Sequence, residues 1–149
     1  MNRIPAAPAA PLRARDRTAT PRGLLLGVVL AALPAIAGAQ QSQTFTHPNA
    51  EVRLTLPPEL SAEDRSMLEI IATTPEVLAT MLDSAAGYAA IALAPAEGMI
   101  RDGVPPASAT ALGGLPDAAT ARSEALRMCD AARSGGPACV VVLELAPRS

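Results

Sequence analysis

Polar and apolar residues alternate in a short stretch that begins at Glu51. Val52, Leu54 and Leu56 fall on one side of an extended chain, with polar residues between them. A period of two residues is typical of a strand with one face buried. The prolines at 57 and 58 end this pattern. We therefore predict a half-buried strand over residues 51–56.

A helical pattern follows this strand. Ser61 can cap a helix, and acidic residues follow it in the first turn, where the helix dipole favours negative charge. Pro75 suits the first turn of a second helical segment. Apolar residues recur at helical spacing in both segments, at Met67, Leu68, Ile71, Val77, Leu78, Met81 and Leu82. The pattern predicts a pair of helices that pack these residues in the core.

A second strand is predicted over residues 88–94. Alternate alanines at 90, 92 and 94 make one of its faces shallow, which would let a helix approach closely, while Ile91 and Leu93 fill the other face. Residues 95–116 contain the turn signals Asp102-Gly103 and Gly113-Gly114. Between these signals, residues 108–112 could form a short strand.

The last helix begins after Asp117, which can serve as its cap, and its apolar side carries alanines and Met128. An apolar strand over residues 139–145 follows the Gly135-Gly136-Pro137 break. The predicted fold is a small α+β two-layer sandwich. If residues 108–112 form a strand, the order is the βαββαβ of a ferredoxin-like fold. If they do not, three strands remain, with helices on one face.

Two cysteines lie on either side of the break between this helix and this strand. The helix runs on for about 6 Å from Cys129 to Arg133, and a returning strand covers about 6.6 Å from Pro137 to Cys139, so the two thiols come level. This geometry suits a disulfide. A redox-active pair is disfavoured, because nine residues separate the cysteines and Cys129 lies near a helix C-terminus. We predict a structural bridge between Cys129 and Cys139.

The composition of the chain changes sharply near residue 40. Residues 1–22 contain five arginines, residues 23–33 are an apolar core, and small residues precede Gln40. This pattern predicts a signal peptide over residues 1–39, cleaved between Ala39 and Gln40. An uncleaved anchor is the alternative, but the apolar run is short and is followed by Pro34. We predict a flexible lead-in over residues 40–50 and a single domain over residues 51–146.

Export changes the charge balance of the chain. Of 12 cationic and 14 acidic residues, the predicted signal peptide carries five arginines and one aspartate, so the rest has seven against thirteen, a net charge of about −6. Nucleic acid is a poor partner for such a chain. Once the leader is cleaved, we expect no stable membrane span. An even number of cysteines also favours an oxidising location, the periplasm or the exterior of the cell.

Few residues could carry catalysis. His47 is the single histidine, so a structural zinc site lacks ligands. A hydrolase would need a nucleophile beside a base, and no Gly-x-Ser-x-Gly motif is present. The acids Glu97, Asp102 and Asp117 could form a paired-carboxylate site but are more simply solvated. We expect no catalytic residues, no cofactor and no metal.

Three segments together resemble a family of small exported bacterial domains of unknown function. In that family an Ala-Ile-Ala strand, here Ala90-Ile91-Ala92, precedes an A-x-x-x-A-L-x-x-C helix ending at Cys129 and a C-x-V-V strand starting at Cys139. The resemblance covers about residues 87–147. The family has no established catalytic residues, so the resemblance implies only the Cys129–Cys139 bridge. Some such chains are labelled 5-aminolevulinate synthase, but that pyridoxal-phosphate chemistry requires a lysine, and this chain has none.

The functional hypothesis from sequence is an exported, non-enzymatic accessory or interaction protein, whose partner is a protein or a small molecule outside the cytoplasm. One alternative is a periplasmic small-ligand-binding protein that uses the loop 95–116, because Met99, Ile100 and Val104 make this long loop unusually apolar. We favour the simpler interpretation that these residues pack on the core. A hydrolase that uses His47 is the least favoured alternative.

Overall fold

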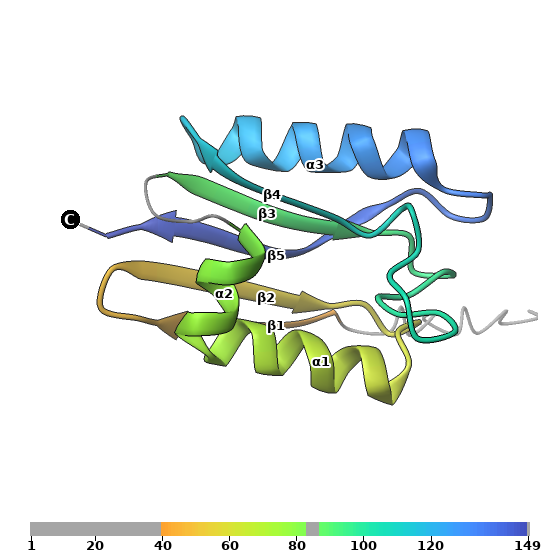
Figure 1. The fold of residues 1–149 in the computed structure, drawn as a ribbon, viewed down its shortest axis with the longest axis horizontal. Coiled ribbons are helices and arrows are strands. Elements are labelled where there is room, and N and C mark those ends of the chain that lie inside the picture. The colour runs from red at the N-terminus through yellow and green to blue at the C-terminus, as the bar shows by residue number, and fades with distance from the viewer. Residues whose placement is uncertain (1–39, 83–86, 149) are drawn as a thin grey trace, which may run out of the picture. The chain divides into compact units, whose positions relative to one another are not determined.

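The computed structural model describes residues 40–82 and 87–148 (Figure 1). The predicted signal peptide, residues 1–39, lies outside the described residues. The elements are β1 (Gln41–Thr46), β2 (Ala50–Leu56), α1 (Ala62–Thr73), α2 (Pro75–Leu82), β3 (Tyr88–Leu93), β4 (Thr110–Leu115), α3 (Ala118–Ala132) and β5 (Val140–Pro147). From β2 onwards they follow the expected βαββαβ succession, with two helices in the first crossover. The predicted α+β class is confirmed.

The strands form one antiparallel sheet in the order β1-β2-β5-β3-β4. Local sequence signals start the helices as predicted. The Ser61 hydroxyl accepts a hydrogen bond from the Asp64 amide at 3.0 Å, and the Asp117 carboxylate accepts one from the Thr120 amide at 2.8 Å. Each cap satisfies an amide that the first helical turn leaves unpaired.

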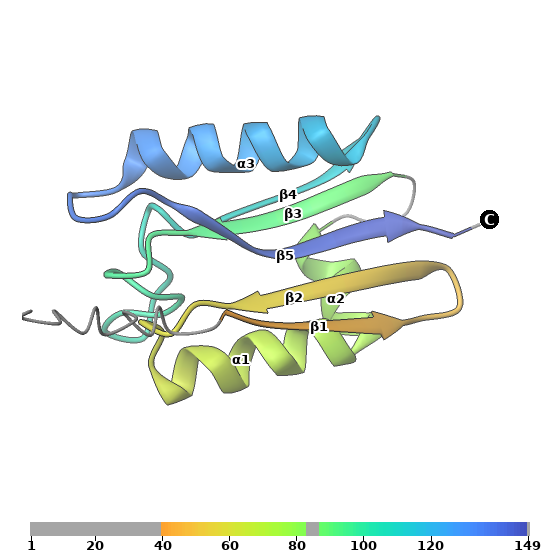
Figure 2. The ribbon, with the colours of Figure 1, turned by 180° about the vertical axis from the view of Figure 1, so that it is seen from behind.

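Helices cover both faces of the sheet (Figures 1 and 2). On β3, Ala89, Ile91 and Leu93 belong to a core cluster with residues of α1 and α2, whereas Ala90 and Ala92 belong to a second cluster with α3. Successive side chains of a strand point to opposite faces, so α3 lies opposite α1 and α2. The predicted two-layer arrangement is therefore wrong, and so is the ferredoxin-like alternative with its helices on one face. The domain has three layers.

The alanine face of β3 explains how α3 fits. Ala90, Ala92 and Ala94 are fully buried against Ala121 and Ala125 of α3. Small residues on both surfaces let the helix backbone approach the sheet closely, as the sequence predicted. The larger side chains, including Ile91 and Leu93, fill the layer between the sheet and α1–α2. The sheet thus has one thin and one thick apolar layer.

Two predicted boundaries need correction. The flexible lead-in expected over residues 40–50 is wrong, because β1 pairs with β2 over all six of its residues and the His47 amide donates to the Ala50 carbonyl at 2.8 Å. The polar side chains of β1 are almost all exposed, so no apolar alternation marked the strand. At the other end, β5 continues to Pro147, one residue beyond the predicted domain.

The uncertain strand forms, but it is shifted along the chain. β4 starts two residues later than expected and includes Gly113-Gly114, which the sequence suggested as a turn. A Cβ atom on Gly113 would lie only 1.5 Å from the carbonyl oxygen of Leu82. The glycine is therefore needed because the end of α2 packs directly on the backbone of β4.

The Cys129–Cys139 disulfide is confirmed, with the two Cα atoms 6.1 Å apart. It joins the last turn of α3 to the residue before β5. Cys129 is fully buried and Cys139 nearly so. The bridge therefore fixes the end of α3 against the sheet.

Candidate functional site

The residues considered for catalysis have separate local roles. The Nε2 atom of His47 lies 2.8 Å from the Ala72 carbonyl oxygen, which ties the β1–β2 turn to α1. Asp117 caps α3, and Asp102 lies in an exposed turn with a φ of 54°. Among the described residues, no hydrogen bond joins any two of His47, Glu97, Asp102 and Asp117. The structure therefore does not assemble them into one site.

Glu97 instead connects two loops. Its carboxylate accepts hydrogen bonds from the Ser108 hydroxyl at 2.6 Å and from the Ser134 amide at 2.7 Å. These two bonds, the Ser108 bond first, hold the pKa of Glu97 below its ordinary value. The side chain thus links both ends of the loop after β3 to the turn after α3. This is a positioning role.

Asp64 holds the same loop from the other side. Its buried carboxylate accepts hydrogen bonds from the Ser61 hydroxyl and the Met99 amide, both at 2.7 Å. Burial by itself would raise the pKa of Asp64, but these hydrogen bonds outweigh burial and the pKa lies below its ordinary value. A Cβ atom on Gly98 would lie 2.7 Å from the carboxylate. The loop backbone is therefore packed directly against Asp64.

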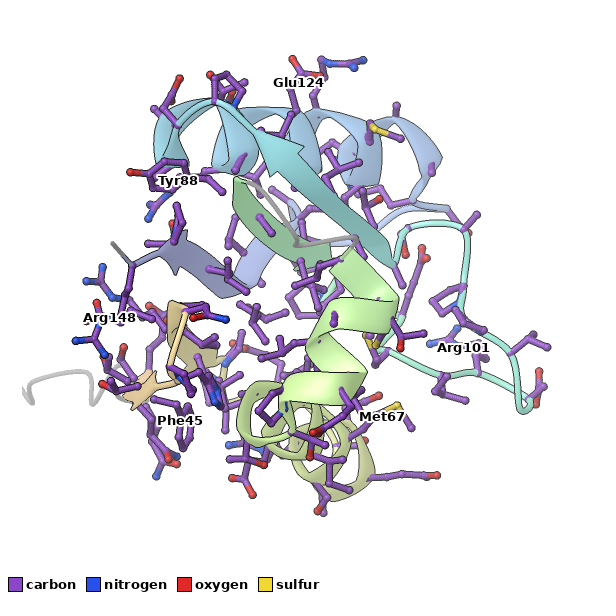
Figure 3. The ribbon with its side chains drawn as sticks, turned by 60° about the vertical axis from the view of Figure 1, so that its left-hand side comes forward. Phe45, Met67, Tyr88, Arg101, Glu124 and Arg148 are labelled. Atoms are coloured by element: carbon purple, nitrogen blue, oxygen red, sulfur yellow. A yellow bond between two sulfur atoms is a disulfide. The ribbon has the colours of Figure 1, made fainter. Side chains whose placement is uncertain are left out.

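The apolar residues of this loop divide between core and surface. Met99 is buried in the main core cluster and Ile100 packs against it, as the packing interpretation expected. Val104 is 61% exposed at the tip of the turn. Figure 3 shows Arg101 on this loop, on the opposite side of the view from Tyr88 and Arg148. Neither of the two surface hollows beside α3 includes any of these loop residues.

The best candidate for a binding site lies beside α3. This helix packs on β3, β4 and β5, and the same face of β1 and β2 extends beyond it. Two neighbouring hollows share Ala118 and Glu144 and follow the boundary between the helix and this open part of the sheet. We call them together the α3 groove, defined by Glu51, Arg53, Ala118, Arg122, Leu126 and Glu144.

The floor of the α3 groove is charged. Arg122 of α3 donates to the Glu144 carboxylate of β5 at 2.6 Å, and Arg53 of β2 is the cross-strand neighbour of Glu144. Glu51 lies two residues before Arg53, on the same face. Opposite charges therefore alternate across the groove, from α3 over β5 to β2. An ion pair near the surface adds little stability. The Arg122 side chain remains 53% exposed, so a partner can reach its charge.

The wall of the groove along α3 is mostly apolar. Ala118, Ala119 and Leu126 line it, together with Arg122 and Ser123. The hollow on this side measures about 420 Å³ and opens widely to solvent, while the hollow nearer β2 measures about 120 Å³. The smaller hollow is well below the volume of a typical small-molecule pocket, about 300 Å³ or more. It can take a side chain rather than a cofactor.

The sequence contained only part of this site. It indicated that the polar residues of 51–56 face away from the core, and the apolar side predicted for the last helix implies a polar side, to which Arg122 belongs. It could not show that these two polar surfaces meet, because Arg122 and Arg53 are brought together only by the β2–β5 pairing and the position of α3. Glu144 was not recognised as a site residue, because the residues on both sides of it in the sequence are apolar.

No group of metal-ligating side chains that could hold an ion occurs within residues 40–82 and 87–148. In these same ranges, no helix has the length and apolar character needed to cross a bilayer.

Fold and site together define a small α+β domain with one disulfide and an incompletely covered sheet face. Comparison with protein-family models, curated proteins and solved structures finds no match to this chain.

Proposed function

We propose that this chain is an exported, non-enzymatic accessory protein that binds an extended segment of a partner protein in the α3 groove. The observation that carries the proposal is the juxtaposition of an apolar helix wall with a charged, open strand surface. A peptide can place apolar side chains against Ala119 and Leu126 and polar groups against Arg53 and Glu51. Mixed surfaces of this kind are typical of binding sites for protein segments.

Export is supported by two independent features. The first 39 residues have the basic, apolar and small-residue regions of a signal peptide. The Cys129–Cys139 disulfide is compatible with an oxidising compartment such as the periplasm or the cell exterior. The proposal is therefore a periplasmic or secreted protein whose mature form begins at Gln40.

A non-enzymatic role is supported by the positions of the polar residues. His47, Glu97 and Asp117 are each engaged in contacts that hold the fold together. Small-ligand binding by the loop 95–116 finds less support, because Met99 is buried in the core and Asp64 and Glu97 tie the loop down. The α3 groove is the better candidate surface.

A peptide library displayed on phage tests this function. The target is protein recovered from outside the cytoplasm, with an intact mass measured first to check that it starts at Gln40. Ala119→Trp fills the groove, and Ala131→Trp adds the same bulk at an exposed position of the same helix outside it. We expect selected peptides to bind the wild type and Ala131→Trp alike, and Ala119→Trp about ten-fold or more weakly.

Two results would contradict the proposal. Peptides that bind Ala119→Trp as well as the wild type would place recognition elsewhere on the surface. A library that yields no binder to the folded wild type would argue against a peptide-binding role. Arg53→Glu adds a test of the charged floor, since it should change which peptides are selected.

A further inference from the structure

The outer strand β1 forms an edge of the sheet. It lies at one end of the strand order, and within residues 40–82 and 87–148 its one partner is β2, in a regular register of six residue pairs. Figures 1 and 2 show its place at the edge. An edge strand has unpaired N–H and C=O groups along its outer side. These groups can form hydrogen bonds with a further strand.

The register shows which backbone groups of β1 point outwards. The His47 amide donates to the Ala50 carbonyl, and this pair continues the β1–β2 register. In an antiparallel ladder, alternate residues direct both backbone polar groups to the neighbouring strand. Phe45 and Gln43 therefore bond to β2, as His47 does. The N–H and C=O groups of Ser42, Thr44 and Thr46 point away from the sheet.

β1 lacks the features that usually protect an edge. It contains no charged residue, no proline and no bulge. The other edge strand, β4, is irregular, because it contains Gly113-Gly114 and Gly114 has a φ of 71°. The β3–β4 register is also irregular. Of the two edges that the described strands form, the β1 edge is therefore the better suited to accept another strand.

The distribution of charge indicates which strand could pair with the outer edge of β1. All seven arginines and all thirteen acids of residues 40–149 lie outside β1. Two copies of this acidic chain can therefore meet at β1 without placing like charges opposite each other. We infer that two copies associate by antiparallel pairing of β1 with β1, which joins their sheets into one.

The hydroxyl side chains of β1 favour one register for this pairing. Residues that lie directly opposite must share a face of the joined sheet. Pairing about Thr44 satisfies this condition and places Ser42 opposite Thr46 on the face that bears the α3 groove. The three residue pairs whose backbone groups bond across the new interface are then Thr44 with Thr44, Ser42 with Thr46 and Thr46 with Ser42. Every residue in these pairs carries a hydroxyl group. A two-fold axis through this point, perpendicular to the sheet, puts both α3 grooves on the same side of the dimer.

Substitutions at Thr44 test the pairing. Thr44→Pro removes an outward N–H while leaving the β1–β2 hydrogen bonds in place, and Thr44→Lys brings two positive charges together at the axis. Ala131→Lys, at an exposed position of α3 outside the groove, is the charge-matched control. By analytical ultracentrifugation of the exported protein, we expect wild type and Ala131→Lys to dimerise alike. Each Thr44 variant should dimerise about ten-fold or more weakly, because the two-fold axis doubles the loss.

Hydrogen exchange tests the pairing on the wild type itself. The result therefore does not depend on whether a Thr44 variant folds well. The amides of Ser42, Thr44 and Thr46 should become slower to exchange as the protein concentration rises. The Gln43 and Phe45 amides, already bonded to β2, serve as the internal reference. A wild type that stays monomeric at all concentrations overturns the inference. So does a dimer that persists in both Thr44 variants or leaves the three outward amides unprotected.

Discussion

Single carboxylates hold distant segments of this domain together. Asp64 at the start of α1 binds the Met99 amide, and Glu97 binds both the Ser108 hydroxyl and the Ser134 amide. A charged acceptor makes a stronger hydrogen bond than a neutral one. The loop after β3 is long and has little regular structure, so these few bonds determine its position. Glu97, one of the acids considered for a paired-carboxylate site, is thus one of the contacts that order this loop.

The disulfide is the covalent counterpart of these contacts. Cys139→Ser should lower the free energy of unfolding under oxidising conditions by about 2.5 to 3 kcal/mol, because the bridge closes a short loop and restricts the unfolded chain. The measurement is urea denaturation of the wild type and the variant, with and without reductant. The two reduced proteins should be similarly stable. Equal stability of the oxidised proteins would show that the bridge contributes nothing.

The arrangement of elements depends on small residues at close contacts. Alanines on β3 and α3 let that helix lie near the sheet, and Gly113 lets the end of α2 touch the backbone of β4. In each case a small or absent side chain determines how closely two elements approach. These residues carry no chemistry, yet they place α3 where its outer edge forms a wall of the groove.

Gly113→Ala should be strongly destabilising, because its new Cβ atom would overlap the Leu82 carbonyl and force α2 away from β4. We expect a loss of about 3 kcal/mol. Gly114→Ala is the neighbouring control: it has open space around it, and only its φ of 71° opposes a side chain, at a cost of about 1 to 2 kcal/mol. Urea denaturation measures both. Equal losses would mean that the α2–β4 contact relaxes easily.

The domain as a whole should be sensitive to acid. The pKa values of Asp64, Glu97, Asp117 and Asp130 all lie below their ordinary values, which are 3.8 for aspartate and 4.5 for glutamate. For Glu97, Asp117 and Asp130 hydrogen bonds are the main cause, whereas for Asp64 they outweigh burial. On acidification the unfolded chain takes up these protons before the native protein does. The stabilisation is therefore complete above the ordinary pKa values and lost as the pH falls through the lowered ones.

We expect the urea midpoint to be constant from neutral pH to about 5 and to fall below about 4. Asp64→Asn removes one titrating carboxyl, so this variant should be less stable at neutral pH but lose less on acidification. Glu69→Gln, at an exposed position of the same helix beyond its first turn, is the control and should behave as the wild type. A midpoint that does not move between pH 5 and the acid limit would contradict the role given to these carboxylates.

The sequence by itself determined the features that depend on neighbours along the chain. The alternation in β2, the caps at Ser61 and Asp117, the alanine face of β3 and the Cys129–Cys139 bridge were all predicted and found. Each follows from a period of two or 3.6 residues, a local hydrogen bond or a short loop. The strand β1 was missed because almost all of its side chains are polar and exposed, so they produce no apolar pattern.

Only the tertiary structure decided which face of the sheet each helix covers. Periodicity shows that an element has an apolar side but not what that side packs against. Apolar residues occupy both faces of β3 in the sequence, which is expected when helices cover both sides of a sheet. The two-layer prediction left this signal out of account. The α3 groove and the open edge of β1 exist because helices of limited width cover five strands incompletely. Their residues, such as Arg53 and Glu144, become neighbours only through strand pairing.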